Sequence, residues 1–193
     1  MLGDELIRLA LRNHAERPDS VRVTPVLHAL VERYGETAHF AVLEGTEVVY
    51  RAKMDPPQGA VRLTSEVGGR NPAHRTAVGK LLLSGRVRTE KELREWLGGR
   101  PLEARTPHSI TTVPDLWKEL EATKERGYAV DDQENELGVN CVAVPFESGF
   151  AGLDGAISVS ALTFRMPLDR LVAEVPNIRR IVESPQSPLV AAS

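Results

Sequence analysis

A lone cysteine and two closely spaced serines are the residues of this 193-residue chain most able to carry chemistry. Cys141 begins an alternating pattern with no base beside it, so it could be a nucleophile or a small buried apolar residue. Ser158 and Ser160 stand two positions apart in a predicted strand, so their side chains point to one face. No Gly-x-Ser-x-Gly pattern surrounds them, which argues against a serine hydrolase. The two hydroxyls could form the floor of a small-ligand site or be outward polar positions of a sheet.

The pair Gly79-Lys80 suggests a phosphate-binding loop, but the flanking residues do not complete the motif. Such a loop needs a glycine five positions before that glycine and a serine or threonine after the lysine, where this chain has His74 and Leu81. His74 and Thr76 stand at the start of a predicted helix, whose free N–H groups could bind an anion. Thr76 could equally serve only as the helix cap.

Metal binding and paired-acid chemistry have less support in the sequence. His74, Asp131 and Cys141 could meet on a metal ion, but their spacing matches no zinc signature. Asp131, Asp132 and Glu134 could be paired acids, or they could belong to a solvated strand end whose carboxylates make structural hydrogen bonds. Neither pattern by itself identifies an enzyme class.

The composition is that of one globular domain with an appendage. Apolar residues make up 41% of the chain, and no apolar stretch is long enough to span a membrane. The first residues lack the charged and apolar regions of a signal peptide, and a single cysteine excludes an internal disulfide framework. The net charge of −3 disfavours a stand-alone nucleic-acid binder, which usually has a basic stripe. We expect a cytoplasmic protein.

Hydrophobic spacing predicts helices and strands along the chain. Helical spacing is found at 4–16, 25–34, 74–83, 90–97, 114–127 and 167–183. Pro176 is expected to kink or split the last of these helices. Alternating apolar residues predict a hairpin over 37–54 and strands at 61–63, 128–131, 142–146 and 157–164. Loops are expected at 68–72, 135–140 and 147–155. Strands gathered at both ends of the chain, with helices between them, indicate an α+β fold with an antiparallel sheet.

Four segments of the chain resemble the C-terminal, effector-binding domain of IclR (isocitrate lyase regulator) transcription factors. The longest, Gly127–Pro145, has Gly, three residues, Asp, two residues, Glu, six residues, and then Cys with an aliphatic and a small residue. Pro72–Lys80 is similar to the turn and helix of that family, Gly35–Leu43 to its first strand and Ala156–Ser160 to its last strand. The departures from the family pattern are Leu81 after Lys80 and Phe146-Glu147-Ser148 after Pro145.

The resemblance implies a GAF-like fold, in which helices flank a six-stranded antiparallel sheet, and a sensor without a cofactor rather than an enzyme. It divides the chain into an N-terminal linker helix at 1–20, an effector-binding domain at 21–184 and a disordered tail at 185–193. Family members carry an N-terminal winged helix-turn-helix that binds DNA, and the resemblance implies that this module is absent from the chain. It also implies a homodimer or homotetramer, no contact with membranes, and a small organic or aromatic acid as effector.

The resemblance further implies a binding site for that effector. The polar floor of the site would be formed by Asp131, Cys141, Ser158 and Ser160. Helix-start amides would come from Thr76, Ala77 and Val78, and side walls from Leu63, Asn71 and Val139. None of these residues is Arg or Lys, so backbone amides and hydroxyls would have to bind the anion.

Two other hypotheses remain at this stage. In the first, the chain is an enzyme or a metal-dependent protein that uses Cys141 on a GAF-like fold. In the second, the domain only assembles copies of itself and has a closed pocket. Metal analysis of the purified protein would separate the first from the sensor hypothesis, whereas the sequence does not decide on the second.

Overall fold

The structure, a computed structural model, describes residues 18–57, 63–147 and 155–184. Its helices, including the 3-10 turn η1, are α2 (Pro18–Tyr34), η1 (Ala73–Arg75), α3 (Ala77–Arg86), α4 (Glu90–Leu97), α5 (Val113–Arg126), α6 (Leu168–Ala173) and α7 (Val175–Glu183). Its strands are β1 (Thr37–Glu44), β2 (Glu47–Met54), β3 (Arg70–Pro72), β4 (Ala129–Asp132), β5 (Val139–Phe146) and β6 (Gly155–Leu162). The predicted helix at 4–16 and the tail at 185–193 lie outside the described residues.

The strands of the described residues form one sheet in the order β3-β2-β1-β6-β5-β4, and every neighbouring pair is antiparallel. The first hairpin, β1–β2, and the last, β5–β6, lie side by side because β1 pairs with β6. This confirms the α+β fold with a six-stranded antiparallel sheet. It also brings residues near position 40 next to residues near position 158, which creates the setting for a site.

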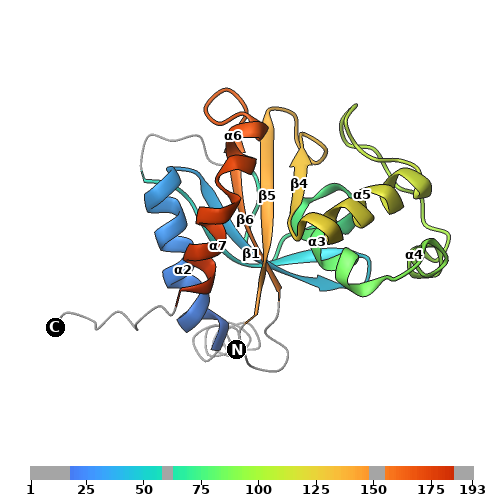
Figure 1. Cartoon of the computed structure of the whole chain (residues 1–193), viewed down its shortest axis with the longest axis horizontal. Coiled ribbons are helices and arrows are strands. Elements are labelled where there is room, and N and C mark those ends of the chain that lie inside the picture. The colour runs from blue at the N-terminus through green and yellow to red at the C-terminus, as the bar shows by residue number, and fades with distance from the viewer. Residues whose placement is uncertain (1–17, 58–62, 148–154, 185–193) are drawn as a thin grey trace, which may run out of the picture.

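Helices cover both faces of this sheet, as Figure 1 shows. On one side lie α2, α6 and α7, and on the other lie α3, α4 and α5. Helix α2 buries Val23, Leu27 and Leu30 on one stripe, at the spacing that an amphipathic helix needs. Its predicted start at residue 25 is wrong, since Pro25 lies inside the helix. Packing of the apolar stripe against the sheet compensates for the amide donor that Pro25 lacks.

Threonine caps begin three of the helices. The side-chain oxygens of Thr76, Thr89 and Thr112 accept hydrogen bonds from the backbone N–H three residues later, at the starts of α3, α4 and α5. Helix α4 therefore begins where the capping pattern predicted, and α5 ends at Gly127, which adopts a left-handed conformation. Because Thr76 caps α3, that helix starts at Ala77 rather than at 74–76.

Other element boundaries also differ from the prediction. The third strand is Arg70–Pro72, in the segment expected to be a loop, and the part of 61–63 that the structure describes, Leu63, lies outside any strand. Strand β5 starts at Val139 rather than at 142, because pairing with β4 and β6 extends it. By contrast, the break expected near Pro176 is confirmed: the last helix is split at Glu174, two residues before Pro176, which supplies no amide donor to continue one helix.

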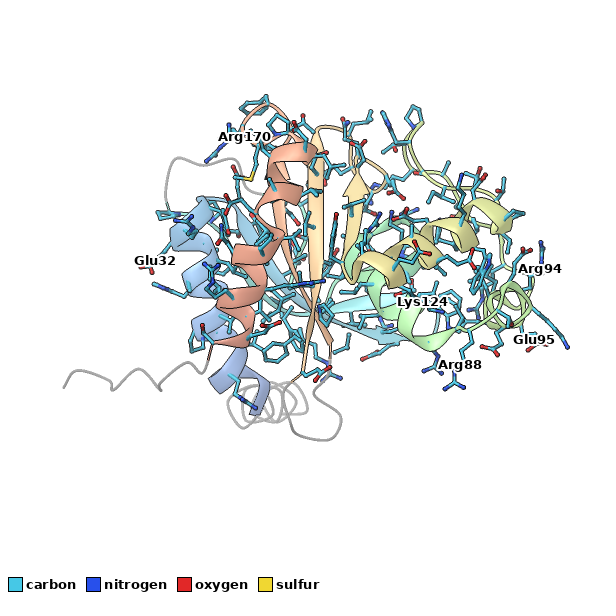
Figure 2. All side chains as sticks on the ribbon, in the orientation of Figure 1. Glu32, Arg88, Arg94, Glu95, Lys124 and Arg170 are labelled. Atoms are coloured by element: carbon cyan, nitrogen blue, oxygen red, sulfur yellow. The ribbon has the colours of Figure 1, made fainter. Side chains whose placement is uncertain are left out.

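Many of the charged side chains lie at the outside of the molecule. Figure 2 shows Glu32, Arg94 and Arg170 pointing away from the sheet on three different helices. In the described ranges, no helix combines the length and apolar character needed to cross a membrane.

Candidate functional site

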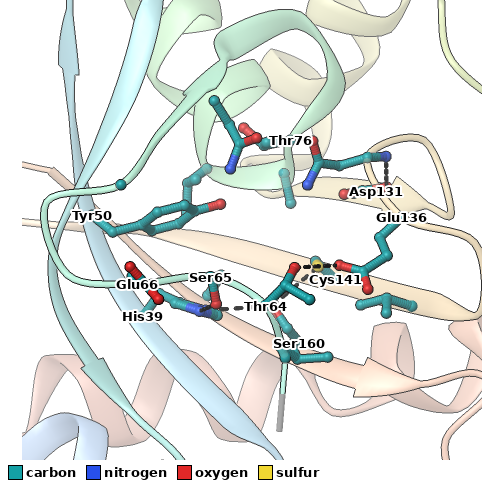
Figure 3. A pocket seen from close by; sticks show the side chains of 18 of the residues that line it. His39, Tyr50, Thr64, Ser65, Glu66, Thr76, Asp131, Glu136, Cys141 and Ser160 are labelled. Atoms are coloured by element: carbon teal, nitrogen blue, oxygen red, sulfur yellow. Dashed lines mark hydrogen bonds between the residues drawn. The ribbon is translucent and has the colours of Figure 1, made fainter. Parts of the chain in front are cut away.

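A cavity of about 370 Å³ lies between the sheet and the N-terminal end of α3. Figure 3 shows its polar side chains converging from several strands and loops. All ten residues singled out in the sequence line this one cavity: Leu63, Asn71, Thr76, Ala77, Val78, Asp131, Val139, Cys141, Ser158 and Ser160. A volume of this size is in the range of small-molecule sites, which usually exceed about 300 Å³.

Strand register explains how the floor residues meet. Asp131 on β4 is paired with Cys141 on β5, which is paired in turn with Ser160 on β6. Ser158, two residues earlier on β6, is paired with His39 on β1. Because residues two apart in a strand share a face, these five side chains form two adjacent rows under α3.

Small residues let α3 approach the sheet and direct its N-terminus at the polar rows. Alanines form much of the sheet face beneath the helix, including Ala41, Ala129 and Ala156. A Cβ on Gly79 would lie 2.2 Å from the carbonyl oxygen of Ala73, so only glycine fits there. Gly79 is thus explained by close packing rather than by phosphate binding.

Asp131 is the buried carboxylate of the cavity, with 3% of its surface exposed. Its Oδ1 accepts hydrogen bonds from the backbone N–H groups of Glu134 (2.7 Å) and Asn135 (3.4 Å). Burial, together with the nearby charge of Glu134, raises the pKa of Asp131 to about 7, although Lys80 acts in the opposite direction. Near neutral pH the carboxyl group of Asp131 is therefore present in both its ionised and its protonated form, and a bound ligand could favour either one.

A buried ion-pair network lies behind Asp131. The Lys80 ammonium, in a side chain only 1% exposed, is 2.5 Å from Glu134 Oε1 and 3.4 Å from Glu119 Oε1. Glu119 also pairs with Arg126 at 2.6 Å. Oxygen Oε2 of Glu134 is buried without a hydrogen-bond partner in the described structure. Lys80 therefore holds together α3, α5 and the loop after β4, and is not available to a ligand.

Cys141 belongs to a chain of hydrogen-bonded groups. Its Sγ donates to Ser160 Oγ at 3.1 Å, and Ser160 Oγ is 3.5 Å from His39 Nδ1. The other ring nitrogen, Nε2, is 2.8 Å from Ser65 Oγ. Burial lowers the pKa of His39 to about 3 and raises the pKa of the Cys141 thiol. A protonated thiol separated from a neutral imidazole by a serine fits a cavity lining better than an activated nucleophile.

His74 is not part of this cavity. Its Nε2 is 3.2 Å from the carbonyl oxygen of Glu103, and it lines a separate groove beside Trp96. The structure thus keeps His74 away from Asp131 and Cys141, contrary to the suggestion that the three could meet on a metal. Over the described ranges, no group of three His, Cys, Asp or Glu side chains has an arrangement that could hold a metal ion.

The structure adds residues that sequence reasoning missed. They come from elements far apart in the chain and include His39, Tyr50, Thr64, Ser65, Arg70, Arg105, Asn135 and Glu136. Arginines therefore do line the cavity, although none was among the predicted positions. Arg70 is engaged by Glu44 at 2.7 Å, whereas Arg105 has no acidic side chain within ion-pair distance in the described part of the chain. Only His39, which shares one face of the predicted first strand with Thr37 and Ala41, had a recognisable signal.

A loop crosses over the cavity and is held at three points, as Figure 3 shows in part. The ammonium of Lys53 donates to the carbonyl oxygens of Leu63 (3.0 Å) and Ser65 (2.7 Å). Thr64 Oγ1 donates to Glu136 Oε2 at 3.2 Å, and this bond joins the loop to the turn before β5. With the Ser65–His39 contact, these bonds place residues 63–65 over the floor and enclose part of the cavity.

Comparison with known proteins locates this architecture in one family. The family described as "Bacterial transcriptional regulator IclR C-terminal" matches residues 20–186. The chain is 39% identical over 140 residues to the HTH-type transcriptional regulator XynR of Escherichia coli (strain K12). That match covers 72% of this chain and 54% of XynR, so the chain spans about half the length of that relative.

Solved structures agree with the family match. The IclR structure from Thermotoga maritima superposes with a TM-score of 0.78 at 29% identity, covering 93% of this chain and 71% of that one. A double mutant of the inducer-binding domain of PobR from Acinetobacter, in complex with 3-hydroxybenzoic acid, superposes with a TM-score of 0.74 at 29% identity. It covers 86% of this chain and 95% of that one.

Proposed function

Because this chain belongs to the IclR family of bacterial transcriptional regulators and contains its C-terminal domain, we propose that it is an effector sensor that binds a small carboxylate in the cavity under α3. One observation carries the proposal: a single cavity collects all ten predicted residues from six separate parts of the chain. A cavity that existed only as a packing defect would be apolar and dry, whereas this one is lined by hydroxyl, amide and carboxyl groups.

The N-terminus of α3 is the part of the cavity suited to a carboxylate. Thr76 uses its own oxygen to satisfy the N–H of Gly79, while Ala77 and Val78 line the cavity at the helix start. Helix-start N–H groups and the helix dipole favour a negative group at this position. Arg105 at the cavity wall adds a positive charge with no acidic partner in the described structure. The domain of PobR that binds 3-hydroxybenzoic acid, an aromatic acid, supports this choice of ligand.

Signalling would proceed by linkage between ligand binding and DNA binding. A ligand stabilises the arrangement that it prefers, and a DNA-binding module attached to the N-terminal side would respond to that change in equilibrium. We propose that this module, a winged helix-turn-helix in the full-length protein, acts on DNA in the cytoplasm. We further propose that the domain works as a homodimer or homotetramer and has no catalytic activity.

A thermal-shift screen tests the proposal. Purified chain is heated with glycolate, lactate, pyruvate, benzoate and 3-hydroxybenzoate, each at millimolar concentration. A ligand at about a hundred times its dissociation constant adds roughly 2.7 kcal/mol, which raises the midpoint by several degrees. Ser158→Ala should reduce the shift, whereas Ser184→Ala, the same change at an exposed position just after the last helix, should not. Equal shifts in Ser158→Ala and Asp131→Ala as in the parent chain would contradict the proposed site.

A further inference from the structure

A groove, separate from the cavity under α3, lies where the end of α4 meets β3 and η1. Its volume is about 410 Å³, which is in the range of small-molecule sites. The half-buried ring of Trp96 forms part of its apolar surface, together with Pro72 and Pro101. Among the described residues, none lines both this groove and the cavity under α3. We call it the Trp96 groove.

The imidazole of His74 supplies the Trp96 groove with a hydrogen-bond acceptor. Its Nε2 is 3.2 Å from the carbonyl oxygen of Glu103, which can only accept, so Nε2 carries the proton. Burial lowers the pKa of His74, which keeps the ring neutral at pH 7 and leaves a lone pair on Nδ1. No described residue donates a hydrogen bond to Nδ1, and this atom is not sealed from solvent. A ligand in the groove could therefore donate a hydrogen bond to it.

Two opposite charges of the groove lining have no ion-pair partner. The guanidinium of Arg100 donates to Thr46 Oγ1, a neutral oxygen, at 2.8 Å. In the ranges that the structure describes, neither this guanidinium nor the carboxylate of Glu103 has an oppositely charged side chain within ion-pair distance. Glu47, the other acidic residue of the lining, is already 3.5 Å from Arg70. The groove thus presents one free cation and one free carboxylate beside an apolar surface.

From this arrangement we infer that the Trp96 groove is a second ligand site, for a free α-amino acid with an apolar or aromatic side chain. The ligand carboxylate meets Arg100, and the ligand ammonium donates to Glu103 and to Nδ1 of His74. The ligand side chain packs against Trp96. A zwitterion satisfies both free charges at once, whereas a simple acid would be repelled by Glu103 and a simple amine by Arg100. This site is independent of the sensor function proposed for the cavity under α3.

Tryptophan fluorescence reports on this groove alone once the other tryptophan is replaced. The chain has two tryptophans, and Trp117→Phe leaves only Trp96. A thermal melt confirms that this variant is folded. Addition of L-phenylalanine or L-leucine at millimolar concentration should then change the emission of Trp96 in a saturable manner. The absence of a saturable change with both amino acids would overturn the inference.

Analogues of L-phenylalanine test the need for a zwitterion. The analogue 3-phenylpropionate lacks the ammonium and phenethylamine lacks the carboxylate, so each leaves one charge of the groove unmatched. L-Phenylalanine should bind at least about tenfold more tightly than either analogue, as judged by the emission of Trp96. Equal or tighter binding of one analogue would contradict the inference, because the groove would then accept a simple acid or a simple amine.

Variants of the two free charges assign the affinity to the groove. Arg100→Gln and Glu103→Gln each remove one charge from an exposed side chain, and each should weaken the binding of L-phenylalanine about tenfold. Arg88→Gln and Glu125→Gln make the same changes at exposed positions outside the groove and should leave the affinity within about twofold. Equal affinities in the parent chain, Arg100→Gln and Glu103→Gln would show that the groove does not hold the ligand.

Ser158→Ala separates this inference from the proposed function. Ser158 lines the cavity under α3 and not the groove, so its replacement should leave the response of Trp96 to L-phenylalanine unchanged. If Ser158→Ala abolishes that binding while Arg100→Gln does not, the amino acid occupies the cavity, and the inference about the groove is wrong while the sensor proposal stands.

Discussion

Alternate residues of the same strands form the two faces of the sheet, one packed against α2, α6 and α7 and the other facing α3. Toward α2 and α7 the strands present large apolar side chains, including Phe40, Val142 and Ile157, all fully buried. Toward α3 they present alanines together with Asp131 and Ser160, which are also buried. Pairing and strand length are common to both faces, so only side-chain volume and polarity distinguish them.

This difference shows how one sheet can support stability and ligand binding at once. On the apolar face, large side chains fill the space beneath the helices, and the rings of Phe40 and Phe146 meet edge to face at 5.4 Å. On the other face, small and polar side chains leave a cavity of about 370 Å³ and several hydrogen-bonding groups. Part of the packing there is replaced by the Lys80 ion-pair network. If this division holds, changes on the apolar face should mainly lower the free energy of unfolding, and changes on the cavity face should mainly weaken ligand binding.

The largest effect is expected at Lys80, on the helix that covers the polar face. Lys80→Met leaves Glu134 buried with no opposite charge, and breaking a buried pair in this way costs about 3–5 kcal/mol of unfolding free energy. Urea denaturation would measure it. Lys91→Met, at a side chain 87% exposed that also faces a glutamate four residues later, should cost less than about 0.5 kcal/mol. Similar losses of unfolding free energy in the two variants would show that the buried Lys80 ion pairs contribute no more to stability than a surface ion pair does.

Adjacent residues of β6 give the most direct comparison of the faces. Ile157→Ala removes a fully buried side chain from the apolar face and should cost about 2–5 kcal/mol. Ser158→Ala, one position later and on the cavity side, should cost less than about 1 kcal/mol and yet weaken ligand binding. Denaturation and calorimetric titration of both variants check the pair. A Ser158→Ala loss as large as that of Ile157→Ala would mean that the polar face also carries the stability.

Asp131→Asn should stabilise the unliganded domain at alkaline pH. The pKa of Asp131 is about 7 in the folded chain, above its ordinary value, so the folded state binds more protons than the unfolded state between those two values. Stability therefore falls as the pH rises from roughly 4 to 7 and stays low above 7. Asparagine does not ionise, so the variant should gain up to about 4 kcal/mol at pH 8 and little at pH 4.

Thermal melts at the two pH values check this gain, with Asp132→Asn as the exposed control. A loss of stability at pH 8 would mean that the ionised carboxylate is needed for folding rather than reserved for a ligand.

The smallest effect concerns the pH dependence of binding. If a group of the effector donates a hydrogen bond to ionised Asp131, binding lowers the pKa of that carboxyl, and affinity rises as the pH increases through 7. Affinity should be about tenfold lower at pH 6 than on the alkaline plateau. The groups facing Asp131 are Lys80 on α3, Arg75 on η1, Cys141 on β5, Tyr50 on β2 and Glu134 on the following loop.

Titration of lactate or 3-hydroxybenzoate at pH 6 and pH 8 measures this change in affinity with pH. The change should vanish in Asp131→Ala. An affinity that rises toward acid pH would instead indicate that protonated Asp131 donates a hydrogen bond to the ligand.

Local sequence patterns predicted the elements whose causes are themselves local. The Thr89–Glu92 capping pattern located α4, and the alternation in 37–54 located the first hairpin. The motif from Gly127 to Pro145 identified the family and, with it, residues that the structure brings together around one cavity. Strand β3 escaped prediction because its three residues have no periodic pattern and become a strand only by pairing with β2.

The sequence by itself therefore determined the family, the order of most elements and the identity of the polar floor residues, because each depends on short-range patterns. Only the tertiary structure decided that Arg105, His39 and Ser65 join Asp131 and Ser160 around one space, that Lys80 is committed to two glutamates, and that His74 lies elsewhere. Those facts depend on strand register and on the packing of α3, which bring together residues more than a hundred positions apart. Spacing along the chain does not encode such distances.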